Sequence, residues 1–98
     1  MGYDLIAKNK EVGGFSANIH NWSRWYGRFF DELPEKRNGV YRAFNDGFEV
    51  TKDECIKIAV EVNRKMHTAA FDDMPEDRKR HTEEFYEFLL KCDGCEIW

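Results

Sequence analysis

Two short stretches near the N-terminus have the hydrophobic pattern of β-strands, one as an apolar run and one as an alternation of apolar and polar residues. The run Tyr3–Ala7 is apolar and rich in strand-forming residues, and in Phe15–Ile19 apolar residues occupy every second position. Alternation with a period of two is typical of a β-strand with one buried face. Gly13 and Gly14 lie between the two stretches, and a pair of glycines favours a tight turn. The pattern predicts a β-hairpin.

The hydrophobic spacing then changes to three and four residues, which predicts a helix over residues 22–33. Asn21 or Ser23 can cap its start, and Pro34 ends it because proline lacks the amide that a helix needs. The apolar arc of this helix consists of six large side chains, Trp22, Trp25, Tyr26, Phe29, Phe30 and Leu33.

The middle of the chain predicts a second hairpin and a capped helix. The residues "NDG" at positions 45–47 favour a turn between the strands Val40–Phe44 and Phe48–Val50. The residues "TKDE" at positions 51–54 form a capping box, in which Thr51 accepts from the amide of Glu54 and the glutamate side chain reaches back. An apolar stripe follows, so we predict a helix over residues 52–69.

The C-terminal part predicts a helix and a last strand. The helix extends over residues 75–92, with Asp72 or Asp73 as its cap and Pro75 in its first turn. Gly94 stands where a helix commonly ends in the left-handed conformation. Residues 95–98 are long enough for a strand beside one of the first two.

The predicted order of elements is β-β-α-β-β-α-α-β. This order is typical of the α+β class, in which a small, mostly antiparallel sheet has three helices packed on one face. The chain has 98 residues, the size of a single domain, and we expect residues 1–98 to form one.

The composition argues against a membrane-spanning or a secreted protein. The formal net charge is −4, and no run of about 18 apolar residues suggests a membrane span. The N-terminus lacks the basic and apolar regions of a signal peptide. Three cysteines are an odd number, which argues against a secreted disulfide framework. We therefore expect a cytoplasmic protein without a membrane partner.

Several short motifs resemble those of a group of small bacterial and phage proteins. These motifs are "GYDL" followed by a lysine, "NIHNW", "NDGFEVTKDE" and "FYEFLLKCDGCEIW". The resemblance covers most of the chain and implies an α+β fold and a bacterial or phage origin, with the host cytoplasm as the location of a phage product. No activity is assigned to that group, so the resemblance implies no functional residue.

Cys92 and Cys95 form a Cys-x-x-Cys pair at the predicted end of the last helix. Such a pair is half of a zinc site, and the remaining ligands would have to come from one further cysteine and three histidines. Because no second close pair exists, we expect two small buried thiols beside a Gly94 cap. We expect neither a metal ion nor another cofactor.

The sequence contains only weak candidates for a group of catalytic residues. Cys55 with a histidine is a candidate nucleophile pair, but Cys55 lies on the apolar stripe of a predicted helix, where a thiol is inert. Neighbouring carboxylates fall on polar faces, and there is no Gly-rich phosphate loop followed by Lys-Ser/Thr. We therefore expect no enzymatic activity and name no catalytic residue.

The first predicted helix is the best candidate for a binding site. Residues 1–30 hold four basic and two acidic side chains, whereas the rest of the chain is acidic. Arginines near a helix start favour an anion, and an aromatic ring beside an arginine suits the base and phosphate of a nucleotide. The candidate ligand-binding residues are His20, Asn21, Trp22, Arg24, Trp25 and Arg28.

The aromatic arc has two interpretations. A helical apolar stripe usually packs inward, but six bulky groups span more than one face, so we expect part of the arc to stay exposed as a contact site. Gly27 indicates close approach by another chain segment or a ligand.

Two functions follow from these interpretations. The first is a non-enzymatic binding protein that sequesters a small anionic, nucleotide-like ligand, in its sharpest form a phage sponge for a host immune nucleotide signal. The alternative is a protein-interaction module that inhibits a host protein, or forms a homodimer, through an exposed aromatic patch. We expect no extended nucleic acid as a partner.

Overall fold

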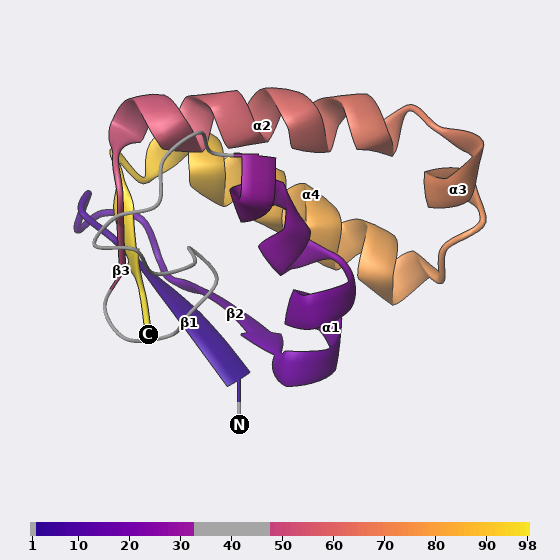
Figure 1. Ribbon diagram of the computed structural model, residues 1–98, viewed down its shortest axis with the longest axis horizontal. Coiled ribbons are helices and arrows are strands. Elements are labelled where there is room, and N and C mark those ends of the chain that lie inside the picture. Colours follow the sequence, from indigo (N-terminus) through magenta and orange to yellow (C-terminus); the bar gives the residue numbers. More distant parts are fainter. Residues whose placement is uncertain (1, 33–47) are drawn as a thin grey trace.

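The computed structural model describes residues 2–32 and 48–98. In chain order the elements are β1 (Gly2–Ala7), β2 (Phe15–Asn18), α1 (Ile19–Arg24), the 3₁₀ helix η1 (Tyr26–Glu32), β3 (Phe48–Val50), α2 (Lys52–Met66), α3 (Ala69–Asp72), α4 (Glu76–Lys91) and β4 (Cys95–Ile97). A four-stranded sheet lies at one end of the molecule, and the long helices α2 and α4 extend from it (Figure 1). The predicted α+β class is confirmed.

The strands of the sheet follow the order β2-β1-β4-β3, and all three pairings are antiparallel. Leu5 of β1 is opposite both Phe15 and Ile97, so these side chains share one face. All three are buried, whereas Asp4 faces outward and accepts a hydrogen bond of 2.7 Å from the Ser16 hydroxyl. Both predicted N-terminal strands are therefore confirmed, and the period-two pattern also predicted the buried face of β2.

The predicted pairing of the C-terminal strand is confirmed, whereas the predicted second hairpin lies partly outside the described residues. The C-terminal strand joins β1, one of the two expected neighbours, and its other edge pairs with β3. The strand predicted over Val40–Phe44 lies outside the described residues, as does the "NDG" turn.

The first helix differs from its prediction over residues 22–33. α1 begins at Ile19 because Asn18, rather than Asn21 or Ser23, is the N-cap, and its side-chain oxygen accepts from the Asn21 amide at 2.8 Å. α1 ends at Arg24, and η1 continues the chain in the tighter 3₁₀ form. Trp25 separates the two with φ −137° and ψ −73°, which are not helical angles.

The capping box of α2 is confirmed. The Glu54 amide donates to the Thr51 hydroxyl at 3.2 Å, and the Thr51 amide donates to the Glu54 carboxylate at 2.9 Å. α2 ends at Met66 rather than at residue 69, because Thr68 caps the short helix α3, which the pattern did not predict.

The predicted N-terminal cap of α4 is wrong, whereas its predicted C-terminal turn is confirmed. Pro75 is its N-cap residue and makes no side-chain hydrogen bond, so neither Asp72 nor Asp73 caps it, contrary to expectation. At the other end Gly94 has φ 99°, as predicted, and Asp93 also has a positive φ of 58°. Two left-handed residues in succession turn the chain from α4 into β4.

The core lies between the sheet and helices α2 and α4, and aromatic rings fill much of it. Phe85 of α4 is near its centre, with its ring centroid within 6.2 Å of the rings of Phe15, Tyr26, Phe29 and Phe30. Rings of this size bury a large apolar area each, which suits a small domain.

Candidate functional site

Trp22 does not form a stacking platform, contrary to its place among the candidate ligand residues. Only 1% of its surface is exposed. The indole stacks on the ring of Tyr3, with centroids 4.7 Å apart, and on that of Phe30 at 5.2 Å. Both neighbours belong to the core, so Trp22 contributes packing rather than a surface for a ligand.

The expected exposure of the aromatic arc is also wrong for most of its described members. Tyr26 and Phe30 are 0% exposed and Phe29 is 6% exposed, whereas Trp25 is partly exposed. The break at Trp25 explains this result, because α1 and η1 present their rings from two directions and so reach more of the core than one straight helix would.

His20 and Asn21 do not join the two arginines of the prediction. Asn21 accepts a hydrogen bond of 3.1 Å from Arg78 of α4, and its amide is already capped by Asn18. His20 is exposed at the start of α1. Since α1 has only six residues, its N-terminus offers little dipole to an anion.

The remaining three candidates do come together in a recess of about 230 Å³. Its lining comes from α1, η1 and α2 and consists of Arg24, Trp25, Arg28, Phe29, Glu61 and Lys65. We call these six residues the cationic recess. The sequence analysis missed Lys65 and Glu61, because nothing local to α2 indicates which of its residues face a segment more than 30 positions earlier.

Trp25 is held firmly in the wall of the cationic recess. Its indole nitrogen donates to the Thr82 hydroxyl at 3.1 Å, and that hydroxyl donates to the Arg78 carbonyl at 2.9 Å. Phe29 packs edge-on against the indole, with centroids 5.3 Å apart and an interplanar angle of 82°. A ring fixed at its edge and partly exposed loses little freedom when a ligand stacks on it.

The charges of the cationic recess are unbalanced. Three cationic side chains line it against one carboxylate, that of Glu61. Glu61 forms an ion pair with Arg64 at 3.1 Å, which offsets its charge. Among the side chains that the structure describes, no ion pair involves Arg24, Arg28 or Lys65. The recess therefore favours a negatively charged group.

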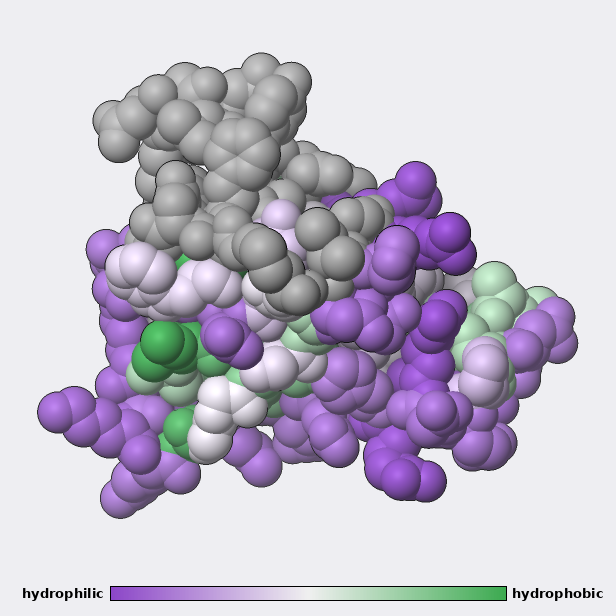
Figure 2. All heavy atoms as spheres, turned by 90° about the horizontal axis from the view of Figure 1, so that it is seen from below, coloured by the Kyte–Doolittle hydropathy of each residue, from purple (hydrophilic) through white to green (hydrophobic). Residues whose placement is uncertain are grey.

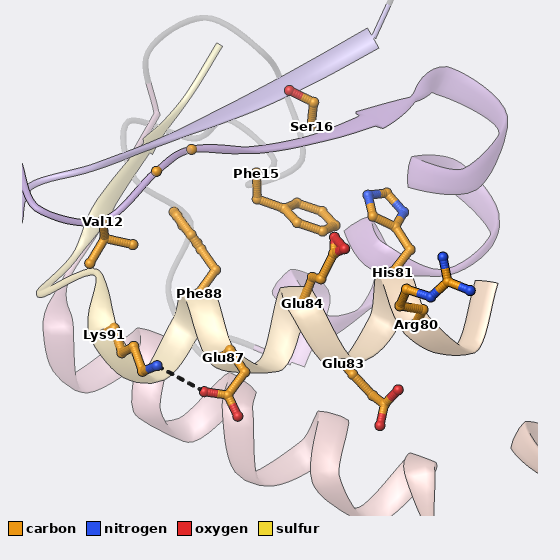
Figure 3. A pocket seen from close by; sticks show the side chains of 12 residues that line it. Val12, Phe15, Ser16, Arg80, His81, Glu83, Glu84, Glu87, Phe88 and Lys91 are labelled. Carbon is orange, nitrogen blue, oxygen red and sulfur yellow. Dashed lines mark ion pairs between the residues drawn. The ribbon is translucent and has the colours of Figure 1, made fainter. Parts of the chain in front are cut away.

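A larger and more open groove of about 770 Å³ lies between the hairpin and α4. Phe15 of β2 and Phe88 of α4 lie between the two elements, and the α4 side chains surround them (Figure 3). Glu83, Glu84 and Glu87 line the groove, and the last pairs with Lys91 at 3.2 Å. With three carboxylates against the two cations Arg80 and Lys91, this groove has a negative balance and suits an anion less well than the cationic recess does.

His81 borders that groove but is engaged by the core. Its ring stacks on Phe15 with centroids 4.6 Å apart, and its Nδ1 lies 2.9 Å from the Tyr26 hydroxyl. Burial raises the pKa of Tyr26, so this phenol stays protonated at neutral pH. The pair has no carboxylate or nucleophile in hydrogen bond with it among the described residues, which gives it no catalytic arrangement.

The prediction of buried thiols at Cys92 and Cys95 is confirmed, and Cys55 joins them. All three are 0% exposed, and their sulfur atoms lie within 4.8 Å of one another. We call them the cysteine cluster. The Cys55 thiol has no described histidine in the cluster, so it lacks the base of a nucleophile pair.

Hydrogen bonding between the thiols sets their acidity. The hydrogen bonds of Cys55 and then Cys95 to the Cys92 sulfur lower the pKa of Cys92. The hydrogen bond with Cys92 raises the pKa of Cys55, and the hydrogen bond with Cys55 raises that of Cys95. The Cys92 thiol itself donates to the Leu89 carbonyl at 3.7 Å, so the three thiols are linked to one another and to the end of α4.

The rest of the described surface is mostly polar. On the face seen in Figure 2, hydrophilic residues cover most of the described area and the apolar areas are small. The exposed large apolar residues are Ile6, Ile56, Val60, Leu90 and Trp98. None of them comes from the aromatic arc, so the described part of that arc does not supply an exposed aromatic patch.

Comparison of the chain with family models, with curated proteins and with solved structures finds no significant match. The motif resemblance to small bacterial and phage proteins therefore stays a prediction. In the described parts of the chain, no helix is both long and apolar enough to cross a membrane.

Proposed function

We propose that this protein is a non-enzymatic binding protein that holds a small anionic ligand in the cationic recess. The observation that carries the proposal is the meeting of Arg24, Arg28 and Lys65 around the partly exposed ring of Trp25. Three cations close together repel one another, and an anion between them relieves that repulsion.

A nucleotide-like ligand suits this arrangement best. Arginine can donate two parallel hydrogen bonds to a phosphate, and an indole face can stack on a base. The recess of about 230 Å³ is smaller than the roughly 300–1,000 Å³ of pockets that enclose a drug-sized molecule. We therefore infer that the recess takes the phosphate end of a mononucleotide or dinucleotide and leaves the remainder at the surface.

Sequestration is the mode of action that fits such a site. Among the described residues that line the recess, the cations Arg24, Arg28 and Lys65 outnumber the one carboxylate, that of the ion-paired Glu61, so the lining favours holding an anion. A phage or bacterial protein with this property would act by lowering the free concentration of a nucleotide signal.

Isothermal titration of the full chain with a panel of mono-, di- and cyclic nucleotides tests the proposal. Loss of one charge-assisted hydrogen bond costs about 1.5–3 kcal/mol, so Arg24→Ala and Arg28→Ala should each weaken binding about 10- to 100-fold. Lys57→Ala is the matched control, because Lys57 is an exposed cation of α2 outside the recess.

Two results would count against this function. One is the absence of measurable binding for every member of the panel. The other is an equal loss of affinity in Lys57→Ala and the arginine variants, which would indicate a general charge effect rather than a site. Raising the salt concentration should weaken specific binding without abolishing it, since the recess shields its charges in part.

A protein-interaction module is the second candidate, and Trp98 is the observation that favours it. Trp98 is 49% exposed and Ile6 of β1 is 52% exposed. Trp98 directly follows β4, and its backbone exchanges hydrogen bonds of 2.7 and 2.8 Å with Asp4, two residues before Ile6. Measurement of the mass in solution distinguishes this candidate, because association through this face should be lost in Trp98→Ala and kept in Arg28→Ala.

A further inference from the structure

The cysteine cluster draws its three sulfur atoms from three different elements. Cys55 lies in the first turn of α2, Cys92 is the C-cap of α4, and Cys95 is the first residue of β4. The Cys55 and Cys95 residues are 40 positions apart in the sequence, yet their sulfurs are separated by 3.9 Å. The fold therefore assembles a thiol-only site that no local motif contains.

The spacing of the sulfurs matches the edge of a metal–thiolate site. A zinc–sulfur bond is about 2.3 Å long, so two thiolates on one tetrahedral ion lie about 3.8 Å apart. The Cys55–Cys95 separation of 3.9 Å already has this value. Since all three sulfurs lie within 4.8 Å of one another, less than about 1 Å of side-chain movement would bring the third into the same coordination sphere.

The turn between Cys92 and Cys95 is fixed by its backbone. Asp93 and Gly94 both have positive φ, and the carbonyls of Cys92 and Gly94 each accept a backbone hydrogen bond of 2.9 Å, from Asn9 and Lys8 respectively. A side chain at Gly94 would come within 3.1 Å of the Val50 carbonyl and 3.3 Å of the Lys52 amide. The loop is therefore packed directly against the junction that leads into α2, where Cys55 lies.

The surroundings of the cysteine cluster can balance a negative charge. The N-terminal turn of α2, which carries Cys55, is the positive end of the helix dipole. Lys52 forms an ion pair of 3.5 Å with Asp93 in the loop, and the Lys8 side chain passes 3.3 Å from the position that a Gly94 side chain would take. Lys8 also forms an ion pair of 2.6 Å with Glu49, so carboxylates engage both lysines, and the end of the helix dipole is the positive charge left for the cluster.

We propose that Cys55, Cys92 and Cys95 bind one thiolate-seeking metal ion, either Zn²⁺ or Cu⁺. Thiolates select these ions over the oxygen-seeking Mg²⁺ and Ca²⁺. The described residues supply three sulfur ligands and no histidine to the cluster, so Zn²⁺ would need a fourth ligand from outside this set, whereas Cu⁺ is served by sulfur alone. The contrasting interpretation is that the thiols only fill space as small apolar side chains.

Proton release by the reduced wild-type chain gives the first test. Each thiol must lose its proton before it can bind a metal ion. Addition of Zn²⁺, or of Cu⁺ under anaerobic conditions, to the weakly buffered protein should release two or three protons per bound ion. Release of one proton or none in both experiments would overturn the proposal, and this measurement requires no variant that has to fold.

Substitution of the ligands gives the second test. Native mass spectrometry should find one ion per chain, and competition with a chelator should measure its affinity. Loss of an outer-shell group already costs about 10- to 100-fold in affinity, so Cys55→Ser and Cys95→Ser should each lose more than about 100-fold. His67→Ala is the control, because His67 is an exposed histidine at the opposite end of α2 and lies outside the cluster.

The two ions are separate arms of one proposal. Cysteine-dependent binding of either ion supports the site, and the titration in which binding is observed identifies the ion. Binding that persists in the serine variants but falls in His67→Ala would assign the ion to the surface and overturn the proposal. The nucleotide titration above does not use these residues, so the two proposals fail independently.

Discussion

Gly27 is the position where a single methyl group should have the largest effect on this fold. It is buried at the start of η1, directly against Trp22. A Cβ atom at this position would lie 2.6 Å from the Trp22 indole nitrogen and 2.8 Å from its carbonyl oxygen. The sequence predicted such a close approach, and the structure shows that the neighbour is the chain itself.

The change in the free energy of unfolding caused by Gly27→Ala is the sum of two opposing contributions. Replacing glycine by alanine in a helical segment normally stabilises by up to about 1 kcal/mol. Here the clash involves a backbone oxygen and an indole that is held between Tyr3 and Phe30, so neither can withdraw without disturbing the core. Overpacking of this kind costs about 1–3 kcal/mol and occasionally more. We expect Gly27→Ala to be destabilising by about 2 kcal/mol.

Thermal unfolding followed by tryptophan fluorescence measures the difference in stability between Gly27→Ala and the wild type. For a chain of this size 1 kcal/mol corresponds to a shift of about 4–8 °C in the thermal midpoint, so Gly27→Ala should unfold roughly 8–16 °C below the wild type. Gly13→Ala is the control, since an added Cβ there meets nothing within 4 Å. A Gly27→Ala protein as stable as Gly13→Ala would refute the packing argument.

Two further predictions concern the cap of α2 and the buried phenol. Thr51→Ala removes the hydroxyl that accepts from Glu54, so the free energy of unfolding should fall by about 1 kcal/mol, whereas Thr51→Ser should keep most of it; equal stability of the two variants in urea would contradict this. Burial raises the pKa of Tyr26 above its ordinary value of 10.0, so its contribution to stability is complete below about pH 10 and is lost as the pH rises further. Unfolding measured from pH 8 to 11 should therefore show a smaller alkaline loss in Tyr26→Phe than in the wild type, and parallel curves would contradict that expectation.

Local signals predicted most of the described fold. Alternation predicted which face of β2 is buried, because Phe15 and Ala17 are two positions apart and both point inward. For β1 the apolar run predicted a strand but not its buried face. The capping box fixed the start of α2, because both of its hydrogen bonds are made by residues three positions apart. These features need only neighbours in the sequence.

The first helix shows where local signals mislead. Asn18 ends β2, as the alternation predicted, and it also caps α1, because its side chain accepts from the Asn21 amide. The alternation assigned Ile19 to the strand as well, but Ile19 is the first residue of α1. The break at Trp25 has a tertiary cause, because its indole hydrogen bond to Thr82 of α4 joins residues 57 positions apart. A straight helix was therefore predicted where the core selects two short ones.

The candidate sites were predictable only in part for the same reason. Arg24, Trp25 and Arg28 follow from one segment, and they do meet in the cationic recess. Lys65 completes it from α2, just as Cys55 completes the pair Cys92 and Cys95 from α2. In both cases the missing member comes from a distant part of the chain, and only the fold determines which of its side chains face the site.

The helix α2 therefore links the two proposed sites while keeping them chemically separate. Cys55 is in its first turn and Lys65 in its last, and ten residues of helix span about 15 Å. Rotation of α2 about its own axis would move both side chains away from their sites. The capping box fixes the end of α2 at which Cys55 lies. A metal ion at the cysteine cluster would fasten that end to α4 and β4 as well. It would thus order the wall of the cationic recess without contacting the ligand, so its removal should weaken nucleotide binding less than loss of Arg24 does.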